Sequence, residues 1–236
     1  MEKEFIFTTF KQHNIQLSDT QISQFLSFYH LLIETNKQFN LTAITDFEEV
    51  VEKHFLDSCL NYLDYLPNST VCDIGSGAGF PAIPLKIMRP DLTITMVDSL
   101  NKRINFLNEC TKKLNLSNTK AIHSRAQELA SIVGRECFDY VTARAVAQLN
   151  ILLELCAPYV KLGGKVVALK SMNAETEIEA AQKAIKTLGL ELEKTENYVI
   201  NSKNEKYTRK FIYFVKKNHT PAQFPRPKNK VTTNPL

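Results

Sequence analysis

The first 65 residues follow a helical pattern of apolar and polar positions. Along residues 22–33 the apolar side chains recur at intervals of three and four, so they share one face of a helix. The positions on this face are Ile22, Phe25, Leu26, Tyr29, Leu32 and Ile33. Ser18 with Gln21, and Thr45 with Glu48, have the spacing of capping boxes. They predict the start of a second helix and of a third helix that runs towards Leu63.

After a turn at residues 67–69 the pattern changes to short β-branched runs, each followed by a helix-like stretch. These runs span residues 70–74, 92–97, 119–123, 138–143 and 165–169. Strands that alternate with helices form right-handed βαβ units around a parallel sheet. We therefore predict an α/β, doubly wound, Rossmann-like fold with an N-terminal helical extension. Residues 191–200 and 210–215 predict an antiparallel hairpin at the sheet edge, and the Pro- and Lys-rich residues from 218 onwards predict an extended tail.

The first predicted strand runs directly into a glycine-rich turn and then a helix. The segment reads Asp73-Ile74-Gly75-Ser76-Gly77-Ala78-Gly79-Phe80. Glycine at alternate positions permits positive φ angles and lets a ligand lie against the backbone at the carboxyl end of the strand. The next strand leads into Asp98, 23 positions after Gly75, a separation at which an acidic side chain can bind ribose hydroxyls. Together the two elements predict a bound nucleoside.

The glycine spacing separates two kinds of nucleoside cofactor. A dinucleotide fingerprint has its third glycine where this chain has Phe80. A bulky side chain there, with Asp73 two residues before the first glycine, suits a cofactor without pyrophosphate, because a phosphate at the helix amino end needs an open approach. We therefore favour S-adenosylmethionine over a nicotinamide dinucleotide. The alternatives are a nicotinamide-dependent oxidoreductase and a turn with a purely structural role.

Composition limits the class of protein. The 236 residues are 44% hydrophobic and 23% charged, as in an ordinary globular protein. Polar residues interrupt the most apolar segment, residues 145–160, so we expect no membrane span. The first ten residues lack the pattern of a secretory signal, so we expect a cytoplasmic protein. The five cysteines lack the spacing of a metal site or a disulfide framework, so we expect neither.

Positive charge is concentrated at the end of the chain. The formal net charge is +4, but residues 201–236 hold nine Lys or Arg and one acidic residue, Glu205. This asymmetry is typical of a surface that meets a polyanion, which leaves RNA, DNA and an anionic membrane surface as partners. The alternative is a solvated tail that aids solubility.

Six ordered motifs resemble the bacterial small-subunit ribosomal RNA guanine-N7 methyltransferases, also called the glucose-inhibited division protein B or RsmG family. They are NLTAI at residues 40–44, HFLDS at 54–58, DIGSGAGFPAIPL at 73–85, VDS at 97–99 with Lys102 and Arg103, TARAVA at 142–147, and FPR at 224–226. The resemblance covers nearly the whole chain. It implies a class I S-adenosylmethionine-dependent methyltransferase fold and methyl transfer to N7 of one guanine in 16S ribosomal RNA of the small ribosomal subunit.

The resemblance also implies a set of cofactor-binding residues. They are Asp73, Gly75, Ser76, Gly77, Gly79, Phe80, Asp98, Ser99, Ala126, Gln127 and Arg144. Asp98 is expected to hold the ribose, and Ala126 with Gln127 to border the adenine. Guanine N7 carries a lone pair and no proton, so the reaction needs no catalytic base; positioning and electrostatics are then the enzyme's contribution.

Arg144 is the candidate catalytic residue. It follows the fourth predicted strand, where parallel sheets place their ligands. Its guanidinium can hold the cofactor carboxylate, an RNA phosphate or the guanine edge, and the alternative is a structural ion pair. We expect loss of Arg144 to reduce turnover much more than stability.

Further basic residues are candidates for RNA phosphate contacts. They are Lys102, Arg103, Lys170, Arg226 and Lys228, with Arg209, Lys210 and Lys230 as further candidates. His54 and Asp57 lie three apart on one helical face, so they form either a local pair or an RNA contact. Asn40 either caps a helix or points towards the cofactor cleft.

We expect three segments: a helical extension at residues 1–65, a methyltransferase domain at 66–217 and a basic tail at 218–236. A monomer that acts on ribosomal RNA is the favoured function. The competing functions are a small-molecule methyltransferase and a non-catalytic RNA-binding or ribosome assembly factor. Strongly salt-dependent substrate binding favours RNA over a small molecule.

Overall fold

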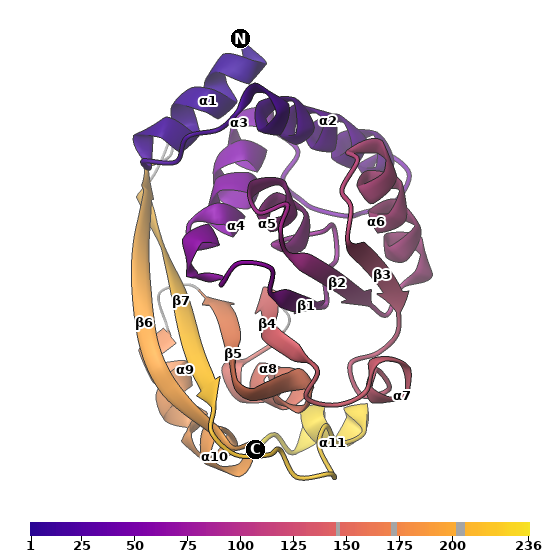
Figure 1. The fold of residues 1–236 in the computed structure, drawn as a ribbon, viewed down its shortest axis with the longest axis vertical. Coiled ribbons are helices and arrows are strands. Elements are labelled where there is room, and N and C mark those ends of the chain that lie inside the picture. The colour runs from indigo at the N-terminus through magenta and orange to yellow at the C-terminus, as the bar shows by residue number, and fades with distance from the viewer. Residues whose placement is uncertain (145–146, 171–173, 202–205) are drawn as a thin grey trace.

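A central β-sheet lies between two layers of helices in the computed structural model, which describes residues 1–144, 147–170, 174–201 and 206–236 (Figure 1). The strands are β1 Thr70–Ile74, β2 Thr93–Asp98, β3 Thr119–His123, β4 Phe138–Arg144, β5 Val160–Lys170, β6 Leu190–Asn201 and β7 Lys206–Lys216. Their order in this part of the chain is β3-β2-β1-β4-β5-β7-β6. Strands β1 to β5 are parallel, and β7 is antiparallel to both β5 and β6. The predicted doubly wound fold and its edge hairpin are confirmed.

The helices account for the apolar periodicity on both sides of the sheet. They are α1 Glu2–Gln12, α2 Asp19–Asn36, α3 Phe47–Val50, α4 Asp57–Cys59, α5 Ala82–Met88, α6 Asn101–Lys113, α7 Ala130–Val133, α8 Leu149–Cys156, α9 Ala174–Ala180, α10 Gln182–Thr187 and α11 Lys228–Thr233. A π-helical segment, Val51–Leu56, joins α3 to α4, and short 3-10 turns lie at Tyr62–Asp64 and Ala157–Tyr159.

Alternating side chains of the strands enter two separate cores. Val71 belongs to a core that also contains residues of α1, α2, α5 and α6, whereas its neighbour Cys72 belongs to a second core with residues of α8 and α10. This alternation is the period of two that a strand buried on both faces requires. The N-terminal helices therefore share one core with a face of the sheet.

The starts of the second and third helices differ in how well the sequence predicts them. At α2 the capping box is confirmed, because Ser18 and Gln21 exchange side chain to backbone hydrogen bonds of 3.2 and 2.9 Å. At α3 the prediction of Thr45 is wrong: Asp46 is the N-cap, and its Oδ1 accepts from Glu49 N at 3.0 Å. A carboxylate at this position also favours the positive end of the helix dipole.

The prediction of an extended tail is wrong in its last part. Residues 228–233 form α11, and Phe224 and Val231 are 3% and 1% exposed. Arg226 binds both carboxylate oxygens of the fully buried Glu154 on α8, at 2.8 and 2.6 Å. Tertiary contacts of this kind override the weak helical signal of a Pro- and Lys-rich sequence.

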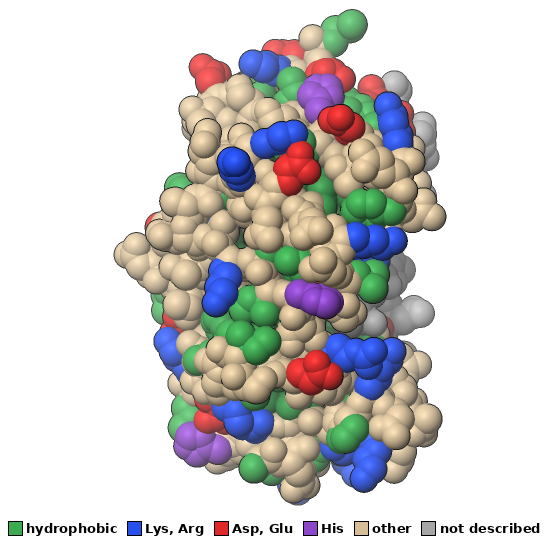
Figure 2. Space-filling view, turned by 90° about the vertical axis from the view of Figure 1, so that its right-hand side faces the viewer, with side chains coloured by type: hydrophobic (Ala, Val, Ile, Leu, Met, Phe, Trp, Pro, Cys, Tyr) green, Lys and Arg blue, Asp and Glu red, His purple; other side chains and the backbone are tan. Residues whose placement is uncertain are grey.

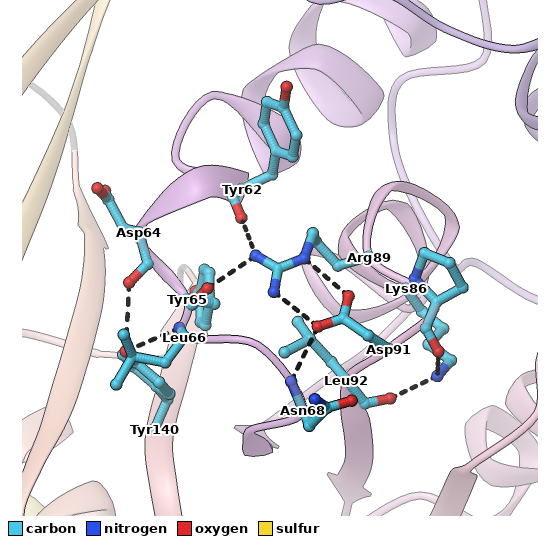
Figure 3. A network of polar contacts seen from close by, with 11 residues as sticks. Tyr62, Asp64, Tyr65, Leu66, Asn68, Lys86, Arg89, Asp91, Leu92 and Tyr140 are labelled. Atoms are coloured by element: carbon cyan, nitrogen blue, oxygen red, sulfur yellow. Dashed lines mark hydrogen bonds and ion pairs between the residues drawn. The ribbon is translucent and has the colours of Figure 1, made fainter.

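A polar network fixes the loops at the amino ends of the strands (Figure 3). The guanidinium of Arg89 binds Asp91 through Nε and Nη2 at 2.8 and 2.7 Å. Its Nη1 donates to the carbonyl oxygens of Tyr62 and Tyr65 at 2.9 and 2.8 Å. This network ties the end of the helical extension to the loop between α5 and β2.

Phe80 joins the glycine-rich turn to the N-terminal helices. Its ring lies 5.4 Å from that of Phe28 and 4.5 Å, stacked, from that of His54, between ring centroids. Only 8% of Phe80 is exposed. Phe28 faces the core together with Phe25 and Leu32, although it is absent from the face that periodicity predicts.

Replacing Phe80 by Ala is expected to lower the free energy of unfolding by about 3–5 kcal/mol, because it leaves a cavity between two layers. Phe7→Ala is the matched control: Phe7 is half-buried on α1, so we expect a loss of about 1 kcal/mol. Urea unfolding measures both values. Equal losses for the two variants would show that Phe80 does not hold the layers together.

Candidate cofactor and substrate site

A cavity of about 410 Å³ lies at the carboxyl ends of the parallel strands. The strand order changes direction between β1 and β4, and open α/β sheets bind their ligands at such a switch point. Six of the predicted cofactor residues line the cavity. They are Gly75, Asp98, Ser99, Ala126, Gln127 and Arg144.

The other predicted cofactor residues are not among those that line the cavity. Ser76 and Asp73 are buried, and Phe80 faces the N-terminal helices. Its ring centroid also lies 5.7 Å from Cζ of Arg144, and the expected contact of Phe80 with the cofactor stays a prediction. Gly79 has a φ of +91°, and a Cβ there would lie 2.6 Å from Cγ1 of Ile83, so this position requires glycine for packing.

Hydrogen bonds to β2 hold the glycine-rich turn in place. Gly75 N donates to the carbonyl oxygen of Val97 at 2.8 Å, and Gly77 N donates to Oδ2 of Asp98 at 2.9 Å. Arg103 also donates to this oxygen at 3.2 Å, while Oδ1 accepts from Leu100 N at 2.9 Å. Asp98 therefore positions the turn as well as lining the cavity.

Asp73 is a buried acid beneath the turn. It is 0% exposed, and its two carboxylate oxygens have no hydrogen-bond partner within the described ranges. Burial raises the pKa of Asp73 to about 8, and the negative charge of Asp98 acts in the same direction.

Several groups of the N-terminal helical extension, residues 1–65, hold the guanidinium of Arg144. Its Nη2 donates to the carbonyl oxygen of Lys53 at 2.8 Å and lies 3.0 Å from Nδ1 of His54. Its Nη1 lies 3.1 Å from Oδ2 of Asp57 and donates to Oγ of Ser58 at 3.3 Å. The structural ion pair weighed as an alternative is thus present, and Arg144 also lines the cavity.

Asp57 lies between two arginines. Arg209 on β7 places Nε 3.0 Å from Oδ1 of Asp57, opposite Arg144. Burial raises the pKa of Asp57, and the two guanidinium groups lower it. Of the two alternatives for His54 and Asp57, the structure does not show the local pair, because each of them contacts Arg144 instead.

His54 is neutral at pH 7. Burial lowers its pKa to about 4, and the nearby charge of Arg144 acts in the same direction. Its Nε2 lies 2.8 Å from Oγ1 of Thr42, so Nε2–H can donate to Thr42 while Nδ1 accepts from Arg144. In the same loop, Oδ1 of Asn36 accepts from the backbone of Leu41 and Thr42, whereas Asn40 is exposed.

The predicted RNA-binding residues divide into two groups. Arg103 and Lys228 line the cavity, and Lys102 is exposed, with Nζ 4.9 Å from the ring centroid of Phe39. The structure corrects the prediction that Lys170 and Arg226 are available for RNA. Lys170 binds Glu177 at 2.6 Å, and Arg226 binds the buried Glu154. These internal ion pairs occupy both cations.

The positive charge at the end of the chain is also partly neutralised within the fold. Acidic partners bind four of its basic residues: Arg209, Lys210, Lys216 and Arg226. Figure 2 shows the side of the molecule that carries α6, β3 and α7, where Lys and Arg side chains are spread widely and acidic side chains are few in the lower half. The basic surface is therefore smaller than the sequence predicts.

Sequence reasoning missed part of the cavity wall. Arg125, Ile151 and Leu155 line it, as do Val231 and Thr232 of α11. Arg125 is adjacent to the predicted Ala126 and could have been found from that position. The residues of α8 and α11 belong to no motif that we connect with the cofactor. Only the tertiary fold brings these two helices to the cavity, so the sequence does not reveal them.

Comparison with known proteins agrees with this geometry. The family model described as GidB, rRNA small subunit methyltransferase G, matches residues 21–207. The chain is 46% identical over 238 residues to Ribosomal RNA small subunit methyltransferase G of Staphylococcus aureus strain Newman, an alignment that covers 100% of this chain and 99% of the relative. The strain JH9 protein of the same name is 45% identical with the same coverage. The chain belongs to the rRNA small subunit methyltransferase G family.

Solved structures share the fold of this family member at low sequence identity. M. jannaschii TYW2 in complex with AdoMet has a TM-score of 0.53 and 17% identity, covering 68% of this chain and 74% of that one. The YcgJ protein of Bacillus subtilis has a TM-score of 0.54 and 13% identity, covering 70% and 100%. The class I methyltransferase fold is confirmed.

None of the helices in the described part of the chain combines the length and the apolar composition needed to cross a bilayer. No group of three or more His, Cys, Asp or Glu side chains among the described residues could hold a metal ion.

Replacing Asp73 by Asn is expected to change how stability depends on pH. The folded-state pKa of about 8 lies above the value near 3.9 of an unfolded chain. The contribution of Asp73 to the free energy of unfolding is therefore fully present below pH 4 and is lost as the pH rises towards 8. Between these two pKa values the free energy of unfolding falls by up to about 1.4 kcal/mol per pH unit. Unfolding by urea between pH 5 and 8 should show the advantage of Asp73→Asn growing with pH. An advantage that is constant over this range would contradict the raised pKa.

Proposed function

We propose that this protein transfers a methyl group from S-adenosylmethionine to N7 of a guanine in 16S ribosomal RNA. The observation that carries the proposal is the cavity at the switch point, where Gly75, Asp98, Ala126 and Arg144 meet in a member of this family. We further propose that the protein acts as a monomer in the cytoplasm.

The residues present fit the cofactor. Asp98 and Ser99 would bind the ribose hydroxyls, and Ala126 with Gln127 would border the adenine. When bound, the cofactor supplies an electrophilic methyl group on a sulfonium.

The chemistry needs orientation rather than proton transfer. The N7 lone pair of guanine forms a bond to the methyl carbon while the carbon–sulfur bond breaks and its electron pair stays on sulfur. No proton is released, which agrees with a site whose neutral His54 already directs its ring nitrogens to Arg144 and Thr42. Holding the two reactants in line can supply about 7–11 kcal/mol of the barrier reduction.

Arg144 is placed to orient the reactants from the rim of the cavity. Both of its terminal nitrogens are engaged by the helical layer, so Nε–H is the donor that these contacts do not use. A bidentate contact with guanine O6 and N7 would block the reacting lone pair. An anionic partner, either the cofactor carboxylate or an RNA phosphate, therefore suits Arg144 better than the base edge.

Four cations among the described residues line the cavity and support a polyanionic substrate. They are Arg103, Arg125, Arg144 and Lys228, of which Arg103 also pairs with Asp98 and Arg144 with Asp57. Cations beside the reacting centre can neutralise phosphates that flank a target nucleotide, and this makes binding salt-dependent. A small-molecule substrate does not require several positive charges around the cavity.

The direct test is transfer of labelled methyl from S-adenosylmethionine into purified small ribosomal subunits that lack the modification. We expect label at a single site, identified by mass spectrometry as 7-methylguanosine, and substrate binding that weakens steeply with salt. Cofactor binding without labelled RNA would overturn the substrate assignment and favour an assembly factor or a small-molecule enzyme.

Replacing Arg144 by Lys is expected to reduce methyl transfer at least a hundredfold, because Lys keeps the charge near Asp57 but loses the planar guanidinium. Arg144→Ala is a poorer test than the sequence implies, since removing one partner of a buried ion pair costs about 3–5 kcal/mol. The rate is measured by label transfer and the stability by urea unfolding. Undiminished transfer by Arg144→Lys would rule out the proposed role of the guanidinium.

A further inference from the structure

The C-terminal helix forms one wall of the cavity that we assign to the cofactor. Lys228, Val231 and Thr232 of α11 line this cavity together with Asp98, Ala126 and Gln127. These residues lie beyond residues 21–207, the part of the chain that the family model matches. They also lie outside residues 66–217, the methyltransferase domain that the sequence predicts. A segment outside that domain therefore forms this wall.

Strong contacts fix α11 against α8. Glu154, fully buried on α8, accepts from Nε, Nη2 and the backbone nitrogen of Arg226, at 2.8, 2.6 and 2.9 Å. Arg135 donates to the carbonyl oxygens of Thr220 and Phe224, which anchors the segment before the helix. Docking of the tail and the shape of the cavity thus depend on the same contacts.

The cavity lining combines apolar and polar side chains. Ile151 and Leu155, one turn apart on α8, and Val231 of α11 are apolar, whereas Lys228 and Thr232 of α11 are polar. Asp98 and Ser99, which come from the end of β2, are polar as well. A lining with both kinds of side chain suits an adenosine group, whose flat base is apolar on its faces and whose ribose carries hydroxyls.

We propose that α11 is a cofactor-binding element, in which Val231 and Thr232 contact the adenosine part of bound S-adenosylmethionine. This inference rests on the proposed function, since it takes the cavity to be the cofactor site. Binding and tail docking are then coupled: the cofactor holds α11 in place, and a docked α11 strengthens cofactor binding by the same factor.

Two adjacent threonines provide a matched test. Thr232 and Thr233 are both exposed, both lie on α11, and both donate a side-chain hydrogen bond to the carbonyl oxygen of Asn229. Thr232 lines the cavity, and Thr233 is not among the lining residues. A Trp in place of Thr232 puts a large ring at the cavity, whereas a Trp in place of Thr233 serves as the control.

Binding of S-adenosylmethionine to the full-length protein is measured by isothermal titration calorimetry. We expect Thr232→Trp to weaken binding at least tenfold and Thr233→Trp to leave it within twofold of the unsubstituted protein. Equal affinities for all three proteins would overturn the role of α11 alone. If the unsubstituted protein does not bind S-adenosylmethionine, the proposed function fails as well.

Limited proteolysis gives a second readout that does not depend on any substitution. Trypsin can cleave after Lys228 and Lys230, which are exposed on α11. We expect saturating S-adenosylmethionine to slow cleavage at these two bonds severalfold, because cleavage requires the helix to undock. An unchanged rate at these bonds in a protein that binds the cofactor would contradict the coupling.

Discussion

The buried carboxylate of Asp57 is the interaction on which the site depends. It binds Arg144 at the end of β4 and Arg209 on β7, and so joins the helical layer to two strands that are not neighbours in the sheet. Two guanidinium groups face one buried carboxylate, so the cluster has more basic than acidic side chains. This excess lies at the carboxyl ends of the strands, where the fold forms its cavity. The N-terminal helices are thus part of the site, because without Asp57 the guanidinium of Arg144 would lack its main acidic partner.

The sequence predicts those features whose cause is local. Strand and helix periods, the Ser18 cap and the positive φ angles of Gly75, Gly77 and Gly79 follow from residues close in the chain. The direction of Phe80 does not, because the glycine motif cannot say whether the side chain after it faces a ligand or a neighbouring helix. In the structure the helical extension covers that side of the turn, so Phe80 packs there.

The roles of the basic residues are harder to predict for a related reason. Whether a lysine or arginine is free to meet RNA depends on where the acidic residues lie in space, and a sequence does not show this. Arg226 and Lys228 are two positions apart, yet Arg226 binds Glu154, 72 positions away, while Lys228 lines the cavity. A count of charges along the tail therefore overstates the basic surface, and the same ion pair that removes Arg226 from it places α11 where Lys228 reaches the cavity.

His54 and Asp73 lie near the site, and burial shifts the pKa of each towards its uncharged form. His54 is neutral at pH 7, with a pKa of about 4, and Asp73 retains its proton up to about pH 8. At neutral pH the Asp73 carboxyl holds its proton and the low pKa of His54 makes it a weak base, and a nucleophile that carries no proton, such as guanine N7, requires no base. Both groups therefore suit a reaction in which the protein orients the reactants and takes up no proton.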